Sequence, residues 1–266
     1  MGKLKIEQRV IGPVATNVYL GINTETKEAF LVDPADRAED IALWITQAGV
    51  TLKAILLTHG HFDHIGAVSE LKKRFQIPVY AMAAEVVVME DSTLNLSCNW
   101  ASAFTVKCDQ ELKDEEVISV AGFEITAYHT PGHTKGGACY YVASERVLFA
   151  GDTLFYHSVG RTDLPTGSMG ELRRSVQRLL SILPDETRVL PGHDCDTSIA
   201  DEKRYNFADY GRQKLAQRKN IKDKPHKRTD EEKPVKFAAA EELQRYKKYQ
   251  CEHYPEKSVQ NRRSNL

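Results

Sequence analysis

The sequence has no long apolar run, few cysteines and almost no net charge, and each absence excludes a class of protein. No stretch approaches the roughly 18 apolar residues that a membrane-spanning helix needs. No uninterrupted apolar segment follows the first lysines, so we expect no secretory signal. The 5 cysteines are scattered, without a Cys-x-x-Cys pair. This usage favours a reduced, cytoplasmic setting over a disulfide-stapled secreted fold.

The net charge of −1 hides an uneven distribution. Residues 210–266 carry 16 Lys and Arg against 8 Asp and Glu, whereas residues 1–209 carry 20 against 29. We therefore expect an acidic body at 1–209 and a basic helical extension at 210–266, with a polar linker around 219–234. The extension is expected to fold back on the body or to join two subunits, and a solvated tail is the alternative.

Apolar patterning predicts a mixed α/β body. Strands are expected at residues 4–11, 17–22, 29–32, 52–57, 79–82, 123–128, 138–142 and 147–150. Helical spacing predicts helices that end at Gly49, that run from about His64 to Phe75, and that start behind the Ser168–Glu171 capping box. A last helix is expected at about 199–218, whereas residues 90–109 have no clear periodicity.

Residues of the types that bind metals lie where predicted strands end. The densest run is His59-Gly60-His61-Phe62-Asp63-His64, directly after the apolar strand at 52–57. His133, Asp152 and His193 each follow a glycine near the end of another strand. Packing imidazoles together costs hydrogen bonds unless something binds them, so a shared site is favoured over a histidine-rich surface loop.

In these motifs the sequence resembles the metallo-β-lactamase superfamily, whose signature T-H-x-H-x-D-H is present at Thr58–His64. The resemblance covers about residues 11–206 and implies a four-layer αββα sandwich of class α/β. It also implies two divalent metal ions, of which zinc is the favoured type and iron or manganese are alternatives. The metal ligands it implies are His59, His61 and His133 on one ion, Asp63, His64 and His193 on the other, and Asp152 bridging both.

Two of these residues, Asp63 and Asp152, are the carboxylates that the resemblance places in the catalytic centre. His129 lies four residues before a proposed ligand, and the family does not use it as one. We expect His129 to support a ligand through a hydrogen bond.

The complete ligand set is similar to that of the glyoxalase II branch. This resemblance implies a metal-dependent hydrolase that cleaves a thioester, such as an acylated glutathione, with a metal-bridging hydroxide. In the loop Val159–Leu164, Arg161 is expected to bind an anionic part of the small-molecule substrate, and Asp163 would repel it. The aromatic residues usual in the glutathione loop of that branch are missing here.

Two other functions stay open. The Gly160–Asp163 run is also similar to that of persulfide dioxygenases, in which a single iron would be held by His59, His133 and Asp152. A non-catalytic member whose basic extension contacts RNA is the third hypothesis. We expect no membrane or nucleic-acid partner, because the extension lacks an aromatic-rich reader. A homo-oligomer is compatible with the sequence.

Overall fold

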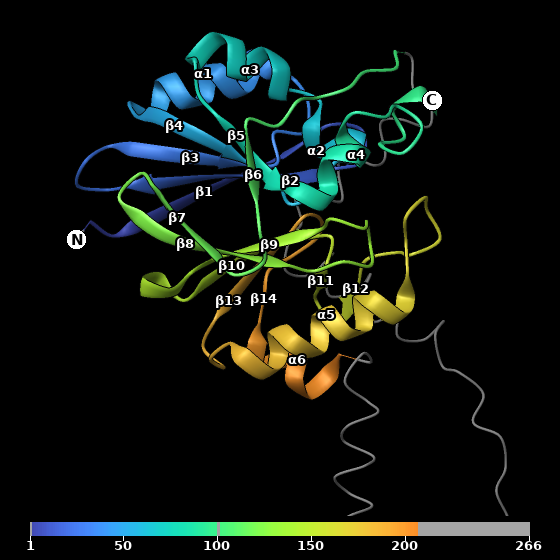
Figure 1. The fold of residues 1–266 in the computed structure, drawn as a ribbon. Coiled ribbons are helices and arrows are strands. Elements are labelled where there is room, and N and C mark those ends of the chain that lie inside the picture. Colours follow the sequence, from blue (N-terminus) through green and yellow to red (C-terminus); the bar gives the residue numbers. More distant parts are fainter. Residues whose placement is uncertain (1, 100–101, 207–266) are drawn as a thin grey trace, which may run out of the picture. The chain divides into compact units, whose positions relative to one another are not determined.

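The computed structural model describes residues 2–99 and 102–206, and these residues form a four-layer αββα sandwich (Figure 1). Two six-stranded sheets lie face to face, and helices cover their outer faces. The predicted fold class is therefore confirmed. The expected basic extension at 210–266 and its linker lie outside the described residues.

The first sheet, sheet A, has the strand order β1-β2-β3-β4-β5-β6. Its strands are β1 (Leu4–Ile11), β2 (Thr16–Asn23), β3 (Glu28–Val32), β4 (Thr51–Leu56), β5 (Val79–Met82) and β6 (Gln110–Leu112). Strands β1 to β3 pair antiparallel, and β3 to β6 pair parallel. Helices α1 (Ala38–Ala48) and α3 (Val68–Phe75) cover its outer face (Figure 1).

The second sheet, sheet B, has the order β14-β13-β10-β9-β8-β7. Its strands are β7 (Glu116–Val120), β8 (Phe123–His129), β9 (Ala138–Val142), β10 (Val147–Gly151), β13 (Arg188–Pro191) and β14 (Thr197–Ser198). Helices α5 (Met169–Ile182) and α6 (Ile199–Tyr205) cover its outer face. A small ribbon of β11 (Leu154–Phe155) and β12 (Ser158–Val159) follows β10.

Side-chain alternation along the strands builds three apolar layers. In β2, Val18, Leu20 and Ile22 face the layer under α1 and α3, whereas Tyr19 faces the layer between the sheets. Phe30 and Phe149 meet edge to face between the sheets, with ring centroids 5.6 Å apart. The apolar runs in the sequence thus reflect strands that are covered on both faces.

The expected helix from His64 to Phe75 is interrupted, and that prediction was wrong in this detail. Helix α2 (Phe62–Ile65) ends before Gly66, and the amide of Ala67 donates to the carbonyl of Pro34 at 3.0 Å. This bond ties the break to the loop after β3. Strands β6 and β7 were not expected; both are short, and each mixes exposed with buried positions.

The remaining short elements connect the sheets. They are the 3-10 turns η1 (Ala83–Glu85), η2 (Ser97–Asn99) and η3 (Ala143–Glu145), and the single-turn helix α4 (Val86–Met89). Helix α5 begins as the capping box predicts, since the hydroxyl of Ser168 accepts from the amide of Glu171. The expected helix from Ile199 is described only as far as Tyr205.

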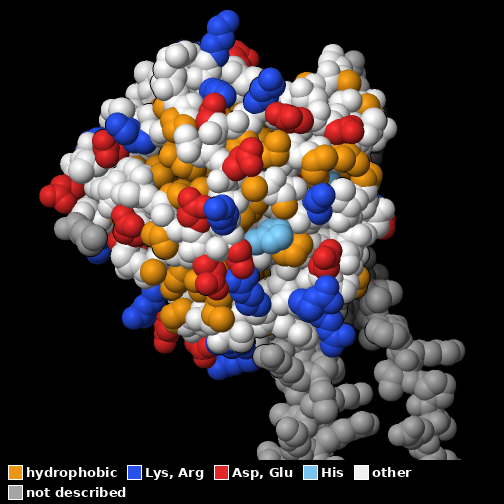
Figure 2. Space-filling view, in the orientation of Figure 1, with side chains coloured by type: hydrophobic (Ala, Val, Ile, Leu, Met, Phe, Trp, Pro, Cys, Tyr) orange, Lys and Arg blue, Asp and Glu red, His pale blue; other side chains and the backbone are white. Residues whose placement is uncertain are grey.

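Three further observations concern the described residues. None of the described helices combines the length and the apolar character needed to cross a bilayer. The four described cysteines, Cys98, Cys108, Cys139 and Cys195, are free thiols. On the face shown in Figure 2, acidic and basic side chains are interspersed rather than segregated.

Leu179 of α5 provides a test of the layer under sheet B. It is fully buried, whereas Ile182 on the same helix is 46% exposed. We expect Leu179→Ala to lower the free energy of unfolding by about 2–5 kcal/mol, because it leaves a cavity against sheet B. Ile182→Ala is the matched control, and its effect should stay near 0.5 kcal/mol in denaturant titrations. Equal losses in the two variants would contradict this packing.

Candidate metal centre

Strand direction brings the predicted ligands to one edge of the sandwich. Strands β8 and β10 both pair antiparallel with β9, and β10 pairs parallel with β13, so β8, β10 and β13 run in the same direction. Their carboxyl ends lead into His133, Asp152 and His193. Strand β4 of sheet A leads into the run from His59 to His64. The site therefore takes side chains from both sheets.

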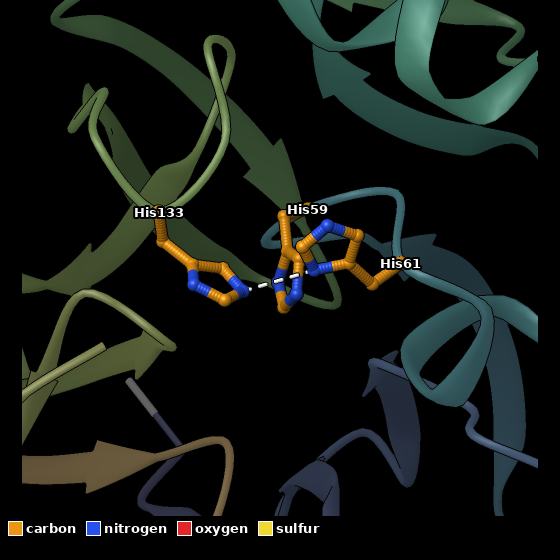
Figure 3. A group of neighbouring side chains, drawn as sticks. All are labelled: His59, His61 and His133. Carbon is orange, nitrogen blue, oxygen red and sulfur yellow. Dashed lines mark hydrogen bonds between the residues drawn. The ribbon is translucent and has the colours of Figure 1, made fainter. Parts of the chain in front are cut away.

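The first ligand group, here called triad 1, consists of His59, His61 and His133. All three side chains are buried, and their ligand atoms lie within 4.8 Å of one another. Figure 3 shows the imidazoles of His61 and His133 converging from opposite sides, with Nδ1 of His61 2.9 Å from Nε2 of His133. Two ring nitrogens at this distance share at most one proton.

The second group, here called triad 2, consists of Asp63, His64 and His193. Nε2 of His193 lies 3.3 Å from Oδ2 of Asp63 and 3.3 Å from Nε2 of His64. Nε2 of His64 lies 3.5 Å from the same carboxylate oxygen. Triad 1 thus takes two ligands from the loop after β4, triad 2 takes two from helix α2, and each takes its third ligand from a loop that follows a strand of sheet B.

Asp152 lies between the two triads. One carboxylate oxygen, Oδ2, is 3.5 Å from Nε2 of His133 and 3.6 Å from Nε2 of His193, and Oδ1 is 3.5 Å from Nε2 of His64. Gly192 lies so close that a Cβ there would overlap Asp152 and His64. The glycine before His193 is therefore required by the close approach of the loops around the carboxylate.

Hydrogen bonds on the outer nitrogens orient three of the rings. The Nδ1 atom of His64 lies 2.9 Å from Oδ2 of Asp33, and Nδ1 of His133 lies 2.8 Å from the carbonyl of Arg161. Nδ1 of His59 lies 3.1 Å from the hydroxyl of Thr58. A partner on Nδ1 leaves Nε2 as the lone-pair nitrogen that faces the cluster.

Asp33 is a functional residue that the sequence analysis missed. It is 1% exposed, and its carboxylate accepts from the amide of Thr58 at 2.8 Å and from its hydroxyl at 2.5 Å. Asp33 also groups with His59 and His64 as a third potential ligand set. Because Asp33 contacts Nδ1 of His64, it orients that ring and leaves Nε2 facing the cluster. An aspartate at the end of a buried strand is the sequence signal that could have found it.

Asn17 is the second residue that the sequence analysis missed. Its side-chain amide donates to the carbonyls of Pro191 and Asp194, both at 3.0 Å, and its backbone amide donates to the carbonyl of Gly192 at 2.7 Å. These three bonds enclose His193 from a strand of sheet A. No local pattern around Asn17 indicates this role.

The cluster passes a chemical test for metal binding. Nε2 of His59, Nε2 of His61 and Oδ1 of Asp152 are buried and have no hydrogen-bond partner among the described residues. Buried polar atoms in proteins are normally paired, so three such atoms in one cluster indicate a missing partner. Nε2 of His59 and Oδ1 of Asp152 carry lone pairs suited to a divalent cation, whereas His61 turns its Nδ1 toward His133, and the His/Asp cluster is therefore metal-binding.

Charges around the two triads differ. Burial, followed by the neighbouring histidines, lowers the pKa of His61 to about 3 and moves the pKa of His59 in the same direction. Burial also acts to lower the pKa of His64, but Asp63, Asp152 and Asp33 raise it to about 10. His59 and His61 of triad 1 are thus neutral imidazoles, whereas metal binding to triad 2 must displace a proton from His64.

Two further predicted residues contact the loop that carries His133, and the ring of His129 meets a backbone carbonyl there instead of the expected ligand ring. Nε2 of His129 is 3.0 Å from the carbonyl of Lys135, in the loop that carries His133. The guanidinium of Arg161 forms a bidentate ion pair with Asp163, with both nitrogen–oxygen distances at 2.8 Å. Both side chains of that pair are exposed. The binding of a substrate anion by Arg161 stays a prediction.

The sequence is similar to several bacterial proteins. It is 39% identical to an uncharacterized protein of Aquifex aeolicus, over 74% of this chain and 92% of that protein. It is 33% identical to the probable metallo-hydrolase YqgX of Bacillus subtilis, over 76% and 96%. It is also 33% identical to the hydroxyacylglutathione hydrolase GloC of Haemophilus influenzae, over 68% and 87%.

Three solved structures are similar in both fold and sequence. The BLEG-1 B3 metallo-β-lactamase has a TM-score of 0.72 at 40% identity, over 76% of this chain and 98% of that one. TTHA1623 in a di-iron-bound form has a TM-score of 0.68 at 35% identity, with the same coverage. ETHE1 from Myxococcus xanthus has a TM-score of 0.65 at 30% identity, over 83% and 92%.

The family model of the metallo-β-lactamase superfamily matches residues 11–193, a range that begins at the end of β1 and includes all seven predicted ligands. The match, the sandwich and the buried ligand cluster agree. The chain belongs to the metallo-β-lactamase superfamily.

Proposed function

We propose that this protein is a dinuclear metallo-hydrolase that cleaves a thioester of a small anionic compound. The observation that carries the proposal is the completeness of the ligand cluster. Both triads are assembled, and Asp152 lies within 3.6 Å of a ring nitrogen from each. A chain that needed a single ion would have no chemical requirement for the second triad.

The donors define the metals that fit. His59, His61 and His133 would hold one ion, Asp63, His64 and His193 the other, and Asp152 would contact both. Imidazole and carboxylate donors without thiolate suit zinc, iron or manganese. When bound, two such ions activate water as a nucleophile at neutral pH and stabilise negative charge on oxygen or sulfur.

The relatives support hydrolysis without fixing the substrate. GloC is named a hydroxyacylglutathione hydrolase, and TTHA1623 is described in a di-iron-bound form. BLEG-1 is named a β-lactamase, whose substrate is an amide rather than a thioester. Because the substrates of the hydroxyacylglutathione hydrolase and of the β-lactamase both react at an activated acyl carbon, acyl transfer to water is the chemistry that we assign. We favour a thioester because the ligand set is that of the glyoxalase II-like branch.

The loop after β12 determines how an anionic substrate would be received. The carbonyl of Arg161 holds His133, so this loop lies directly beside triad 1. The guanidinium of Arg161 is neutralised by Asp163, and a substrate carboxylate would have to compete with that aspartate. We infer that Arg161 offers a forked donor to such a carboxylate and that Asp163 weakens the attraction.

The first prediction concerns Asp152. Freshly purified protein should contain about two metal ions per chain and hydrolyse thioesters, and Asp152→Ala should lower the rate by about 100-fold and also reduce the metal content. The physical reason is that this carboxylate adjoins both triads. Elemental analysis and a thioester assay on the same preparations provide the measurement.

Two controls accompany Asp152→Ala. His129→Ala removes a side chain whose ring nitrogen contacts a backbone carbonyl, and Asp185→Ala removes an exposed partner of Lys203. Both should keep two metal ions. An Asp152→Ala protein with full metal content and full rate would show that the ligand assignment is wrong. Oxygen uptake with a persulfide substrate, with a single bound iron and no thioester cleavage, would show that the protein is a dioxygenase instead.

The second prediction concerns Asp33. In Asp33→Asn, the amide can still accept from Thr58, but its NH₂ group then faces Nδ1 of His64. The ring would carry its proton on Nε2, which is the nitrogen that faces triad 2. We expect the affinity for one of the two ions to fall by about 10- to 100-fold, as measured by competition with a chelator. The exposed neighbour Asp36 offers the control Asp36→Asn, and equal affinities in the two variants would refute this role.

The third prediction concerns the Arg161–Asp163 pair. Arg161→Ala should raise KM for carboxylated thioesters by about tenfold with little change in kcat, because a remote contact is made equally in the ground and transition states. Asp163→Asn should lower KM, because it frees the guanidinium. KM for uncharged thioesters should be the same in both variants as in the wild type. Arg146, an exposed arginine at the turn between β9 and β10, provides the control Arg146→Ala. An unchanged KM across the carboxylated series would remove Arg161 from the substrate site.

A further inference from the structure

Glu85 is a buried carboxylate that belongs to neither triad. It ends the turn η1 after β5 and is 1% exposed. Its Oε1 accepts from the amide of Gly60 at 2.7 Å, and its Oε2 accepts from the hydroxyl of Thr134 at 2.9 Å and from the amide of Gly136 at 2.8 Å. Three donors therefore converge on one carboxylate that has no cationic partner at hydrogen-bond distance within residues 2–99 and 102–206.

The donors belong to the two loops that carry triad 1. Gly60 stands between His59 and His61, and Thr134 directly follows His133. One loop leaves β4 of sheet A and the other leaves β8 of sheet B. Figure 3 shows that the histidines of these loops meet from opposite sides. Glu85 thus connects the two halves of triad 1 through backbone and hydroxyl groups, without contacting a ligand ring.

A carboxylate is the group that this position requires. It presents only acceptors, so all three donors are satisfied together. A glutamine would turn an NH₂ group toward at least one of these donors and leave it buried without a partner. Gly136 packs so closely on η1 that a Cβ would overlap the backbone of Ala84 and Glu85. Burial raises the pKa of Glu85 to about 7, and the three donors act in the opposite direction.

Other bonds join the sheets below these loops. The amide of Ala138 donates to the carbonyl of Thr58 at 2.7 Å, and the hydroxyl of Tyr140 donates to the carbonyl of Leu57 at 2.9 Å. These bonds lie at the bases of the loops, whereas Glu85 contacts the loops next to the ligands. Loss of the Glu85 bonds would therefore leave the sheets joined and release the segments that carry the rings.

We propose that Glu85 is a positioning residue that fixes the separation of the His59–His61 segment from His133 and so sets the metal affinity of triad 1. This inference rests on the proposed metal-dependent function. It predicts that loss of the carboxylate lowers metal affinity by changing the ligand geometry, in addition to any effect on the stability of the fold.

The test compares Glu85→Gln with Glu202→Gln. Glu202 is equally buried and also accepts three hydrogen bonds, from Thr197, from His157 and from Asn206, but these partners lie around α6 and β12. We would measure the dissociation constants of both ions with zinc and a chelator, and the visible absorption spectrum of the cobalt-loaded proteins. Thermal unfolding reports stability separately.

For Glu85→Gln we expect one dissociation constant to rise by about 10- to 100-fold and the cobalt spectrum to change. Glu202→Gln should lower the unfolding temperature while leaving both constants and the spectrum unchanged. Unchanged constants and an unchanged spectrum in Glu85→Gln, or equal changes in both variants, would overturn the inference. If wild-type protein binds no metal at all, the proposed function fails instead, so the two failures are distinguishable.

Two milder variants keep the test decisive if Glu85→Gln does not fold. Thr134→Val removes one of the three donors and keeps the shape of the side chain. Gly136→Ala pushes its loop away from η1 while leaving the carboxylate in place. Both variants should weaken the binding of the same metal ion as Glu85→Gln and alter the cobalt spectrum. Dissociation constants and spectra equal to those of the wild type in both variants would overturn the inference.

Discussion

The structure depends on the gathering of the seven polar side chains predicted as ligands, of which the four histidines His59, His61, His64 and His133 are buried. Imidazoles that face one another lose hydrogen bonds to water, and the cluster leaves buried nitrogens of His59 and His61 without partners. Such an arrangement is unfavourable for the polypeptide alone. It persists because the surrounding groups hold each ring in place, and because a bound cation restores the missing interactions.

Both triads take their ligands from the same two parts of the structure. Each takes two ligands from residues 59–64, in the loop after β4 and in helix α2, and one from a loop that follows a strand of sheet B, so the packing between the sheets sets the distances inside both. The edge-to-face contacts of Phe149 with Phe30 and Tyr19 fix that packing. Asn17 then secures the loop of His193, and Glu85 secures the loop of His133. Metal binding therefore opposes separation of the sheets, and metal-loaded protein gains stability over the metal-free protein.

Local patterning of the sequence predicted most strands and the gathering of metal-binding residue types at strand ends, and the family resemblance carried by those motifs predicted the sandwich and the ligand set. The run from His59 to His64 is dense, and the other ligands each follow a glycine after an apolar strand. The supporting residues are different. Asn17 meets the loop of His193 from more than 170 positions away, and Glu85 meets Gly136 from 51 positions away. Contacts of this kind arise from the fold, so no short pattern reveals them. A lone glutamate among apolar neighbours was the one available clue to Glu85.

The same non-local contacts determine which charges the substrate meets. Asp33, Asp63 and Asp152 place three carboxylates in and behind the cluster, in a body whose residues 1–209 carry more acidic than basic groups. Without metal, this field repels an anion. In the proposed dinuclear form, two divalent ions would add four positive charges and reverse the sign at the cluster, while Arg161 would contribute only to the extent that Asp163 releases it. An anionic substrate, as we propose, would therefore be recognised by the metal-loaded protein, so metal binding and substrate binding would be coupled through charge.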